Sequence, residues 1–229
     1  MMTIRHSDER GVVNHGWLQA KHSFSFGSYY DAEHMGVSAL RVINDDHIAA
    51  GQGFPTHSHQ DMEIITYVIT GAIEHKDSMG NIGILPAGEF QLMSAGSGIS
   101  HSEYNPSTTE PLTLLQIWIE PHRFGLEPGY QQKRFDPQQG LQLIASPDAH
   151  AESFLIHQDL ALYHLRLSAG NSVSHALDAQ RTLYVHLISG EISIAGQMLY
   201  AGDGATIKSV DKVDLQGLKD AEALVFDLP

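Results

Sequence analysis

The 229-residue sequence contains no cysteine, and this absence limits its chemistry. Without cysteine the chain can form no disulfide, no thiolate metal site and no thiol nucleophile. Histidine and the carboxylates are the side chains left to bind a transition metal. The sequence has 15 histidines, so the search for a site begins with them.

Positive charge is also scarce. The sequence has 13 Lys and Arg against 27 Asp and Glu, which gives a formal net charge of −14. A chain of this charge repels phosphate backbones, and no cluster of basic residues offsets the repulsion locally. We therefore expect no direct binding to nucleic acid, whereas a protein partner remains compatible with the charge.

Long apolar segments are missing too. The first residues, MMTIRHSDER, lack the apolar core of a secretory signal peptide. No later stretch approaches the ~18 consecutive apolar residues that indicate a membrane span. We expect a soluble cytoplasmic protein with no membrane partner.

The sequence is rich in short runs of β-branched and aromatic residues, separated by Gly, Pro, Asn and Asp. Such runs occur at 63–69, 112–119, 163–167 and 183–188. Few long helical periodicities accompany them. The pattern is typical of an antiparallel β sandwich or barrel, so the predicted class is all-β.

A weak internal repeat indicates two copies of one β unit. IITYVITGAI (64–73) aligns with LYVHLISGEI (183–192), which places Gly71 on Gly190, 190 − 71 = 119 residues later. A shift near half the chain length is typical of duplication, with chance similarity between two hairpins as the alternative. The Pro- and Gly-containing stretch 121–147 is a candidate linker, and we predict domains at 1–125 and 126–229.

Two pairs of side chains have the spacing of metal ligands. His57 and His59 are separated by one residue, as are His101 and Glu103. Side chains alternate along a strand, so each pair points to one side. Facing each other across neighbouring strands, the pairs would offer three nitrogens and one oxygen to a divalent cation at roughly 2.0–2.2 Å. An isolated His-x-His is usually inert, but the second pair makes a metal site the favoured interpretation.

The residues around these pairs resemble the two signature motifs of the cupin superfamily, in the patterns Gly51-x5-His57-x-His59-x3-Glu63-x7-Gly71 and Gly80-x5-Pro86-x-Gly88-x12-His101. The twelve-residue gap before His101 is much longer than in most cupins. Together with this gap, several segments resemble those of pirins, a bicupin family: HSFSF (22–26), LRVIND (40–45), FPTHSH (54–59), MSAGSGISHSE (93–103) and LQIW (115–118).

The resemblance implies two tandem cupin-type antiparallel β-barrels. It also implies one divalent transition metal per chain, held by His57, His59, His101 and Glu103. Iron(II) is the favoured ion, with zinc, cobalt, nickel, manganese and cadmium as alternative occupants. Many cupins use a glutamate at the position of Glu63, but pirins do not, so we predict that Glu63 lies beside the ligands and orients an imidazole.

Two further predictions follow from the aligned halves and from composition. The repeat sets Ala176 and Asp178 opposite the first histidine pair, so we expect no metal in the C-terminal barrel. The aromatic cluster at residues 24–30, with Phe24, Phe26, Tyr29 and Tyr30, is assigned to the core rather than to a substrate pocket.

The resemblance implies quercetin 2,3-dioxygenase activity, in which O2 cleaves the ring of a flavonol and carbon monoxide is released. In this hypothesis Glu103 is the catalytic base that removes the 3-hydroxyl proton of the substrate. The alternative is a metal-binding regulatory pirin that modulates a protein partner without turnover. A cupin-type sugar-phosphate isomerase is disfavoured, because Lys and Arg are scarce around both motifs.

Overall fold

The computed structural model describes all residues from Met1 to Pro229, and nearly all regular structure in it is antiparallel β-strand. The one helical element is a 3-10 turn at His150–Glu152. No helix in the structure has the length and apolar character needed to cross a membrane. The chain forms two compact units: an N-terminal unit of residues 11–135, and a C-terminal unit of residues 136–229 together with residues 1–10.

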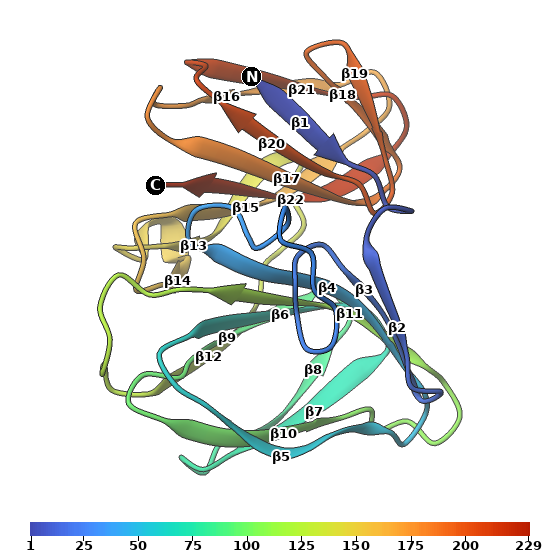
Figure 1. Ribbon diagram of the computed structural model, residues 1–229, viewed down its shortest axis with the longest axis vertical. Helices are drawn as coiled ribbons and strands as arrows, with labels where there is room; N and C mark the ends of the chain where they lie inside the picture. The colour runs from blue at the N-terminus through green and yellow to red at the C-terminus, as the bar shows by residue number, and fades with distance from the viewer. The chain divides into compact units, whose positions relative to one another are not determined.

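The N-terminal unit is a barrel made of two facing sheets (Figure 1). Its seven-stranded sheet has the order β12-β9-β6-β11-β4-β3-β2, and its four-stranded sheet has the order β5-β10-β7-β8. The strands are β2 (Gly11–Asn14), β3 (Leu18–His22), β4 (Leu40–Ile48), β5 (Gly53–His59), β6 (Glu63–Thr70), β7 (Ala72–Asp77), β8 (Ile82–Pro86), β9 (Glu89–Ser94), β10 (Ile99–Tyr104), β11 (Leu112–Ile119) and β12 (Gly129–Arg134).

The C-terminal unit repeats this arrangement, with sheet orders β1-β20-β17-β22-β15-β13-β14 and β16-β21-β18-β19. Its strands are β1 (Met2–Arg5), β13 (Gly140–Ser146), β14 (Phe154–Leu155), β15 (Ala161–Leu167), β16 (Ser172–Ala176), β17 (Thr182–Ser189), β18 (Glu191–Ile194), β19 (Gln197–Tyr200), β20 (Gly204–Lys208), β21 (Lys212–Gly217) and β22 (Ala221–Leu228). The predicted fold class, all-β with two tandem barrels, is confirmed.

The repeat seen in the sequence has a structural basis in one tight turn. Gly71 lies between β6 and β7 with φ of 79°, and Gly190 lies between β17 and β18 with φ of 81°. A side chain strains a backbone in this left-handed region. A Cβ on Gly190 would also lie 2.0 Å from the backbone oxygen of Asp220, so glycine is required there on both grounds.

Two edge strands pair across the predicted domain boundary between residues 125 and 126. Strand β12 follows that point but pairs with β9 of the N-terminal unit, and β1 pairs with β20 of the C-terminal unit. The stretch 121–147 contains β12 and β13, so it is not the strand-free linker that was predicted, although the chain does pass from one unit to the other within it, at residues 135 and 136. Its Pro and Gly residues lie in or next to the turns around these two strands, which composition alone does not distinguish from a linker.

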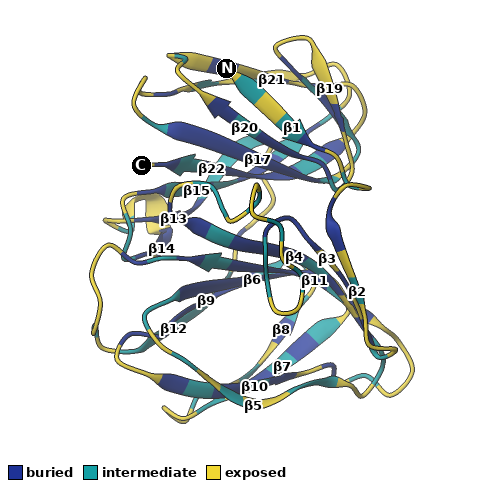
Figure 2. Cartoon of the chain, in the orientation of Figure 1, coloured by how far each residue is buried: buried dark blue, intermediate teal, exposed yellow.

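Most residues of β6 and β11, in the large sheet of the N-terminal unit, are buried, as the colours of Figure 2 show, and a cluster of apolar residues includes members of both strands. The cluster comprises Leu18, Ala20, Ile48, Val68, Ile73, Leu85, Leu112 and Leu114, all buried. Burying one large aliphatic side chain contributes roughly 1.5–3 kcal/mol. This cluster therefore stabilises the barrel independently of any bound ion.

A row of buried polar side chains crosses the middle of the same barrel. The strand registers pair Gln91 with Thr66, Thr66 with Gln116, Gln116 with Asn44, and Asn44 with His22. All five are buried, with Asn44 only 2% exposed. Directly paired residues on neighbouring strands point to the same face of a sheet. We call this set the polar row.

The C-terminal barrel carries apolar residues along the corresponding row. With Gly71 placed on Gly190, Thr66 corresponds to Val185, which is paired with Ala205 and Val225, and Val225 is paired in turn with Tyr163. Ala205, Val185 and Val225 belong to the apolar core of that unit, and Tyr163 packs against it. The corresponding row of the C-terminal barrel therefore lacks the buried amides of the polar row.

Candidate metal centre

Two neighbouring strands of the smaller sheet carry the residues that the sequence singled out. His57 and His59 lie on β5, and His101 and Glu103 lie on β10. These strands are antiparallel, and their register sets His101 directly opposite His57. An irregularity between His101 and Glu103 shifts the register, so that Glu103 pairs with Phe54.

The three imidazoles form one cluster. Their ring centroids are 4.7 Å apart for His57 and His59, 4.5 Å for His57 and His101, and 4.9 Å for His59 and His101. One nitrogen from each ring lies within 4.8 Å of the other two. The Nε2 atoms of His59 and His101 are 2.9 Å apart. This separation fits adjacent ligands bound at about 2.1 Å to one ion, so the donor set could hold a divalent transition metal.

The environment keeps two of the imidazoles neutral, as metal ligands must be. Burial, reinforced by the nearby His57, lowers the pKa of His59 to about 4. Burial, reinforced by its histidine neighbours, lowers the pKa of His101 to about 3. Both rings therefore offer a lone pair at neutral pH.

A backbone carbonyl sets the orientation of the third ring. The Nδ1 of His57 lies 2.8 Å from the carbonyl oxygen of Pro55. A carbonyl can only accept, so Nδ1 carries the proton and donates it. The Nε2 of His57 is then left with a free lone pair for an ion.

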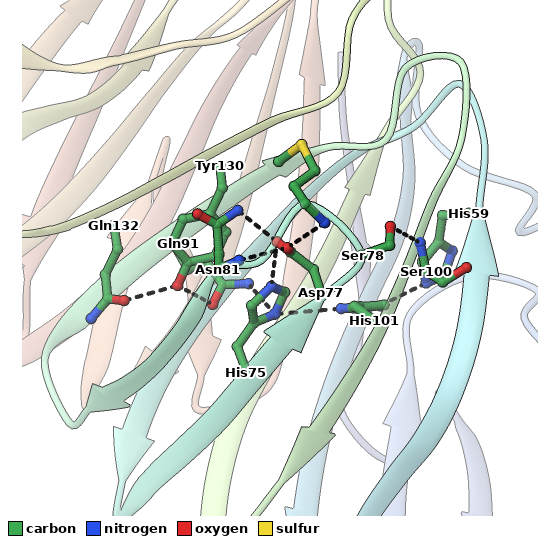
Figure 3. A network of polar contacts seen from close by, with 11 residues as sticks. His59, His75, Asp77, Ser78, Asn81, Gln91, Ser100, His101, Tyr130 and Gln132 are labelled. Atoms are coloured by element: carbon green, nitrogen blue, oxygen red, sulfur yellow. Dashed lines mark hydrogen bonds and ion pairs between the residues drawn. The ribbon is translucent and has the colours of Figure 1, made fainter.

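His101 is supported from behind by a second histidine and a carboxylate (Figure 3). Asp77 accepts hydrogen bonds from the backbone amides of Met79 and Asn81 at 2.9 and 3.0 Å, and from the Asn81 side chain at 2.9 Å. It also lies 3.1 Å from His75 Nε2. Burial raises the pKa of Asp77, but the hydrogen bonds from Asn81 and His75 outweigh this, and the net shift is downward.

These contacts determine which nitrogen of each ring carries a proton. The Asp77 carboxylate accepts, so His75 must donate from Nε2. Burial lowers the pKa of His75, which leaves its Nδ1 as an acceptor that lies 3.4 Å from the Gln91 side-chain nitrogen and 3.5 Å from His101 Nδ1. A proton on His101 Nδ1 would then leave the Nε2 lone pair facing His59. Asp77 and His75 together favour the tautomer of His101 that binds metal.

Glu103 has one oxygen held and one oxygen unpartnered. Gln116 donates from Nε2 to Glu103 Oε2 at 3.0 Å, and Thr66 donates to Gln116 Oε1 at 3.1 Å. Glu103 Oε1 is buried and has no hydrogen-bond partner. Burial raises the pKa of Glu103 to about 7, and the nearby Gln116 amide and Thr66 hydroxyl partly oppose this rise. The polar row thus holds this carboxylate in place.

The four predicted ligands do not all fall within one tight group. The three imidazoles form the first group, whereas Glu103 forms a second group with His75 and His101. The two groups share His101. Both lie in the N-terminal unit, within β5, β7 and β10.

His75 is the functional residue that the sequence analysis missed. A signal was present, since His75 and Asp77 have the same one-residue separation on a strand as the two predicted ligand pairs. Glu63 does not continue the face of His59, because the chain turns at Asp61, whose φ is 50°. Glu63 instead begins β6, where it accepts a hydrogen bond from Ser94 at 3.0 Å.

A cavity of about 380 Å³ opens beside the imidazoles. The aromatic residues Phe26, Phe54 and Trp118 form part of its walls, and neither Lys nor Arg lines it. Trp118 packs edge-on against both Phe26 and His59, with ring centroids 5.1 and 4.9 Å apart. Phe26 lines this cavity, so its assignment to the core alone was wrong. The lining residues are Phe26, Asn44, Asp46, Phe54, Pro55, Thr56, His57, His59, Glu103, Gln116 and Trp118.

Known proteins resemble the chain over its whole length. Residues 4–119 match the pirin family model, and residues 143–228 match a model described as the quercetinase C-terminal cupin domain. The quercetin 2,3-dioxygenase of Escherichia coli K12 is 52% identical over 229 residues, a match that covers 100% of this chain and 99% of the relative.

Solved structures agree with the sequence relatives. The crystal structure of YhhW from Escherichia coli superposes with a TM-score of 0.99 at 52% identity, covering 100% of this chain and 98% of that one. A structure of the bacterial pirin YhhW in complex with nickel(II) gives a TM-score of 0.98 at 51% identity, covering 100% and 99%.

Proposed function

The chain belongs to the pirin family, and from this premise we propose that it is a metal-dependent dioxygenase that cleaves a flavonol such as quercetin with O2. The observation that carries the proposal is the cavity, where an imidazole cluster, an unpartnered carboxylate oxygen and aromatic walls meet. Pockets of about 300–1,000 Å³ with mostly apolar walls and a few polar groups are typical of small-molecule sites.

We infer one divalent metal ion per chain, held by His57, His59, His101 and Glu103. The close imidazole nitrogens and the bare Glu103 Oε1 support this ligand set. Iron(II) is our choice for the native ion, since imidazole and carboxylate ligands suit iron. When bound, the ion would supply Lewis-acid and one-electron chemistry. The cavity beside it has room for an aromatic substrate and dioxygen.

The cavity favours an uncharged planar substrate. Phe26, Phe54 and Trp118 offer ring faces and edges against which flavonol rings can pack. A phosphorylated sugar would need cationic side chains to hold its phosphate, and the cavity has none among its lining residues.

Glu103 is the proposed proton acceptor. A flavonol must lose its 3-hydroxyl proton before it can pass an electron towards dioxygen, so a base is needed within hydrogen-bond reach. Gln116 holds Glu103 Oε2, so Oε1 would be the atom that receives the proton, in a state in which it is not bound to the ion. In the absence of an ion, burial raises the pKa of this carboxylate to about 7, so its uncoordinated form holds a proton more tightly than an exposed glutamate does.

Anaerobic and aerobic turnover of quercetin test the proposal. The protein would be analysed for metal as isolated, then reconstituted with iron, cobalt, nickel or manganese. We expect quercetin consumption and carbon monoxide release in air, and neither in dioxygen-free buffer. A fully metal-loaded protein that consumes no flavonol with any of these ions would contradict the proposal and favour the regulatory alternative.

A further inference from the structure

We propose that Asn44 recognises a hydroxyl group of the substrate, so that the enzyme selects polyhydroxylated flavonols over sparsely hydroxylated ones. The inference rests on the proposed function, because it assigns a partner to a group that faces the same cavity. It adds a specificity-determining residue outside the ligand set and away from the proton acceptor.

The first observation is that Asn44 is buried without a hydrogen bond to its carbonyl. The residue is 2% exposed, and its Oδ1 has no partner. Buried amides are nearly always hydrogen-bonded, because an unsatisfied polar group costs free energy in an apolar surrounding. Asn44 also lines the cavity, so a ligand there can supply the missing donor.

The second observation is the contrast with three other members of the polar row, Gln91, Thr66 and Gln116. Gln91 accepts a hydrogen bond from the Tyr130 hydroxyl at 3.2 Å. Thr66 and Gln116 are linked to each other and to Glu103. The row therefore has an internal structural use up to Gln116, whereas the Asn44 carbonyl has none.

The third observation comes from the C-terminal barrel. There Val225 is the counterpart of Gln116, and Tyr163, which is paired with Val225, is the counterpart of Asn44 in an apolar row. A barrel of this topology thus folds with no amide at the Asn44 position. An asparagine placed there in the N-terminal unit is not required by the fold, which points to a ligand.

The location suits an anchoring role. Asn44 on β4 is paired with Gln116 on β11, and Gln116 holds Glu103. Paired side chains have Cβ atoms about 4.5–5.5 Å apart. A substrate hydroxyl that donates to Asn44 Oδ1 would be separated from the Glu103 carboxylate by the Gln116 side chain. This hydrogen bond would fix the orientation of the flavonol rings in the cavity. A site built to hydrogen-bond a hydroxyl discriminates against analogues that lack it.

The test uses Asn44→Leu, which keeps the shape of the side chain and removes its polar atoms. Metal-loaded wild type and variant would be titrated under dioxygen-free conditions with 3-hydroxyflavone, galangin, kaempferol and quercetin, a series that adds hydroxyls to one skeleton. We expect wild type to gain about tenfold in affinity at the step that adds the recognised hydroxyl, and the variant to lose that gain. The Kd of 3-hydroxyflavone should differ by less than about twofold between wild type and variant, because this compound lacks the hydroxyl that Asn44 recognises.

Thermal unfolding of the ligand-free proteins separates recognition from a structural role. Replacing an unsatisfied amide by an apolar isostere is neutral or stabilising, so Tm of Asn44→Leu should equal or exceed that of wild type. A lower Tm with uniformly weakened binding of all four flavonols would overturn the inference, as would unchanged discrimination. If wild type binds none of the flavonols, the proposed function itself fails, which is a distinguishable result. Gln19→Leu, on the exposed face of β3, is the matched control and should leave both binding and Tm unchanged.

Discussion

The Nε2 atoms of His59 and His101 lie 2.9 Å apart, while burial keeps both rings neutral at pH 7. The support on the far side of His101 favours a proton on its Nδ1, which leaves the Nε2 lone pair facing His59. A shared cation satisfies both nitrogens, and this relationship underlies the predictions that follow.

His59→Ala or His101→Ala should empty the metal site and leave the fold intact. Each variant removes one of the three imidazoles. The buried apolar residues of the N-terminal barrel, such as Ile48 and Leu112, are unchanged. Elemental analysis would measure the metal, and circular dichroism with thermal unfolding would measure the fold. Global unfolding of either variant, or of chelator-treated wild type, would mean that the ion is structural.

Metal affinity should rise with pH between about 5 and 7 because Glu103 must lose its proton to bind. Its pKa is raised to about 7, whereas those of His59 and His101, at about 4 and 3, leave these rings already neutral in this range. A plot of log Kd against pH should therefore be less steep by about one in Glu103→Gln than in wild type. Equal slopes in the two proteins would show that Glu103 does not ionise on binding.

The same raised pKa has a consequence for the metal-free fold. Folded protein holds the Glu103 proton more tightly than the unfolded chain does, so this group's contribution to stability is present at pH 4 and is lost as pH rises through about 7. The lowered pKa values of His59 and His101 act in the opposite direction below pH 6.5. Comparing wild type with Glu103→Gln by denaturant unfolding between pH 6.5 and 8 isolates the carboxylate. Wild type should lose stability relative to the variant across that range.

Glu103→Gln should keep much of its metal, through three unchanged imidazoles, and lose turnover by ~10²-fold or more, the scale of a deleted general base. Raising pH should partly restore the rate, since solvent can then deprotonate the flavonol. Steady-state rates at measured metal occupancy test this, with Glu63→Gln as the comparison. If Glu63→Gln loses turnover and Glu103→Gln does not, the carboxylate has been misassigned.

His75→Leu should weaken metal binding by about 10–100-fold, the usual effect of removing a group that orients a ligand. The cause is the loss of the acceptor for His101 Nδ1. Competition with a chelator would give the affinity, and nitrogen-15 NMR of the imidazoles would report the His101 tautomer. Gln132→Ala, at the far end of the network in Figure 3, is the control and should change neither. A metal affinity equal to that of wild type in His75→Leu would show that His101 binds the ion without a hydrogen bond from its Nδ1 to His75.

The ligand pairs could be predicted because their signal is local. Alternation along a strand fixes the relation of His57 to His59, and neither residue needs distant information. The same rule does not extend to Glu63, since one left-handed residue, Asp61, ends the alternation before it. His75 depends on the pairing of β7 with β10, a contact between residues 26 positions apart that no local pattern encodes.

The edge strands and Phe26 illustrate a second limit. Strands β1 and β12 are short, and their partners are chosen by tertiary packing rather than by their own composition. Phe26 lies outside the strands, and an aromatic residue in a loop fits a core or a cavity equally well by sequence. Its position against Trp118 follows from the folded barrel alone.

The pairing of β1 with β20 has a consequence for biosynthesis. Met2 pairs with Ile207, so β1 is synthesised long before its partner strand β20. Residues 11–135 can complete both of their sheets during translation, while the ten residues ahead of them wait. Completion of the C-terminal unit therefore requires strands that are far apart in the sequence, whereas the sheets of residues 11–135 are built from that one continuous stretch.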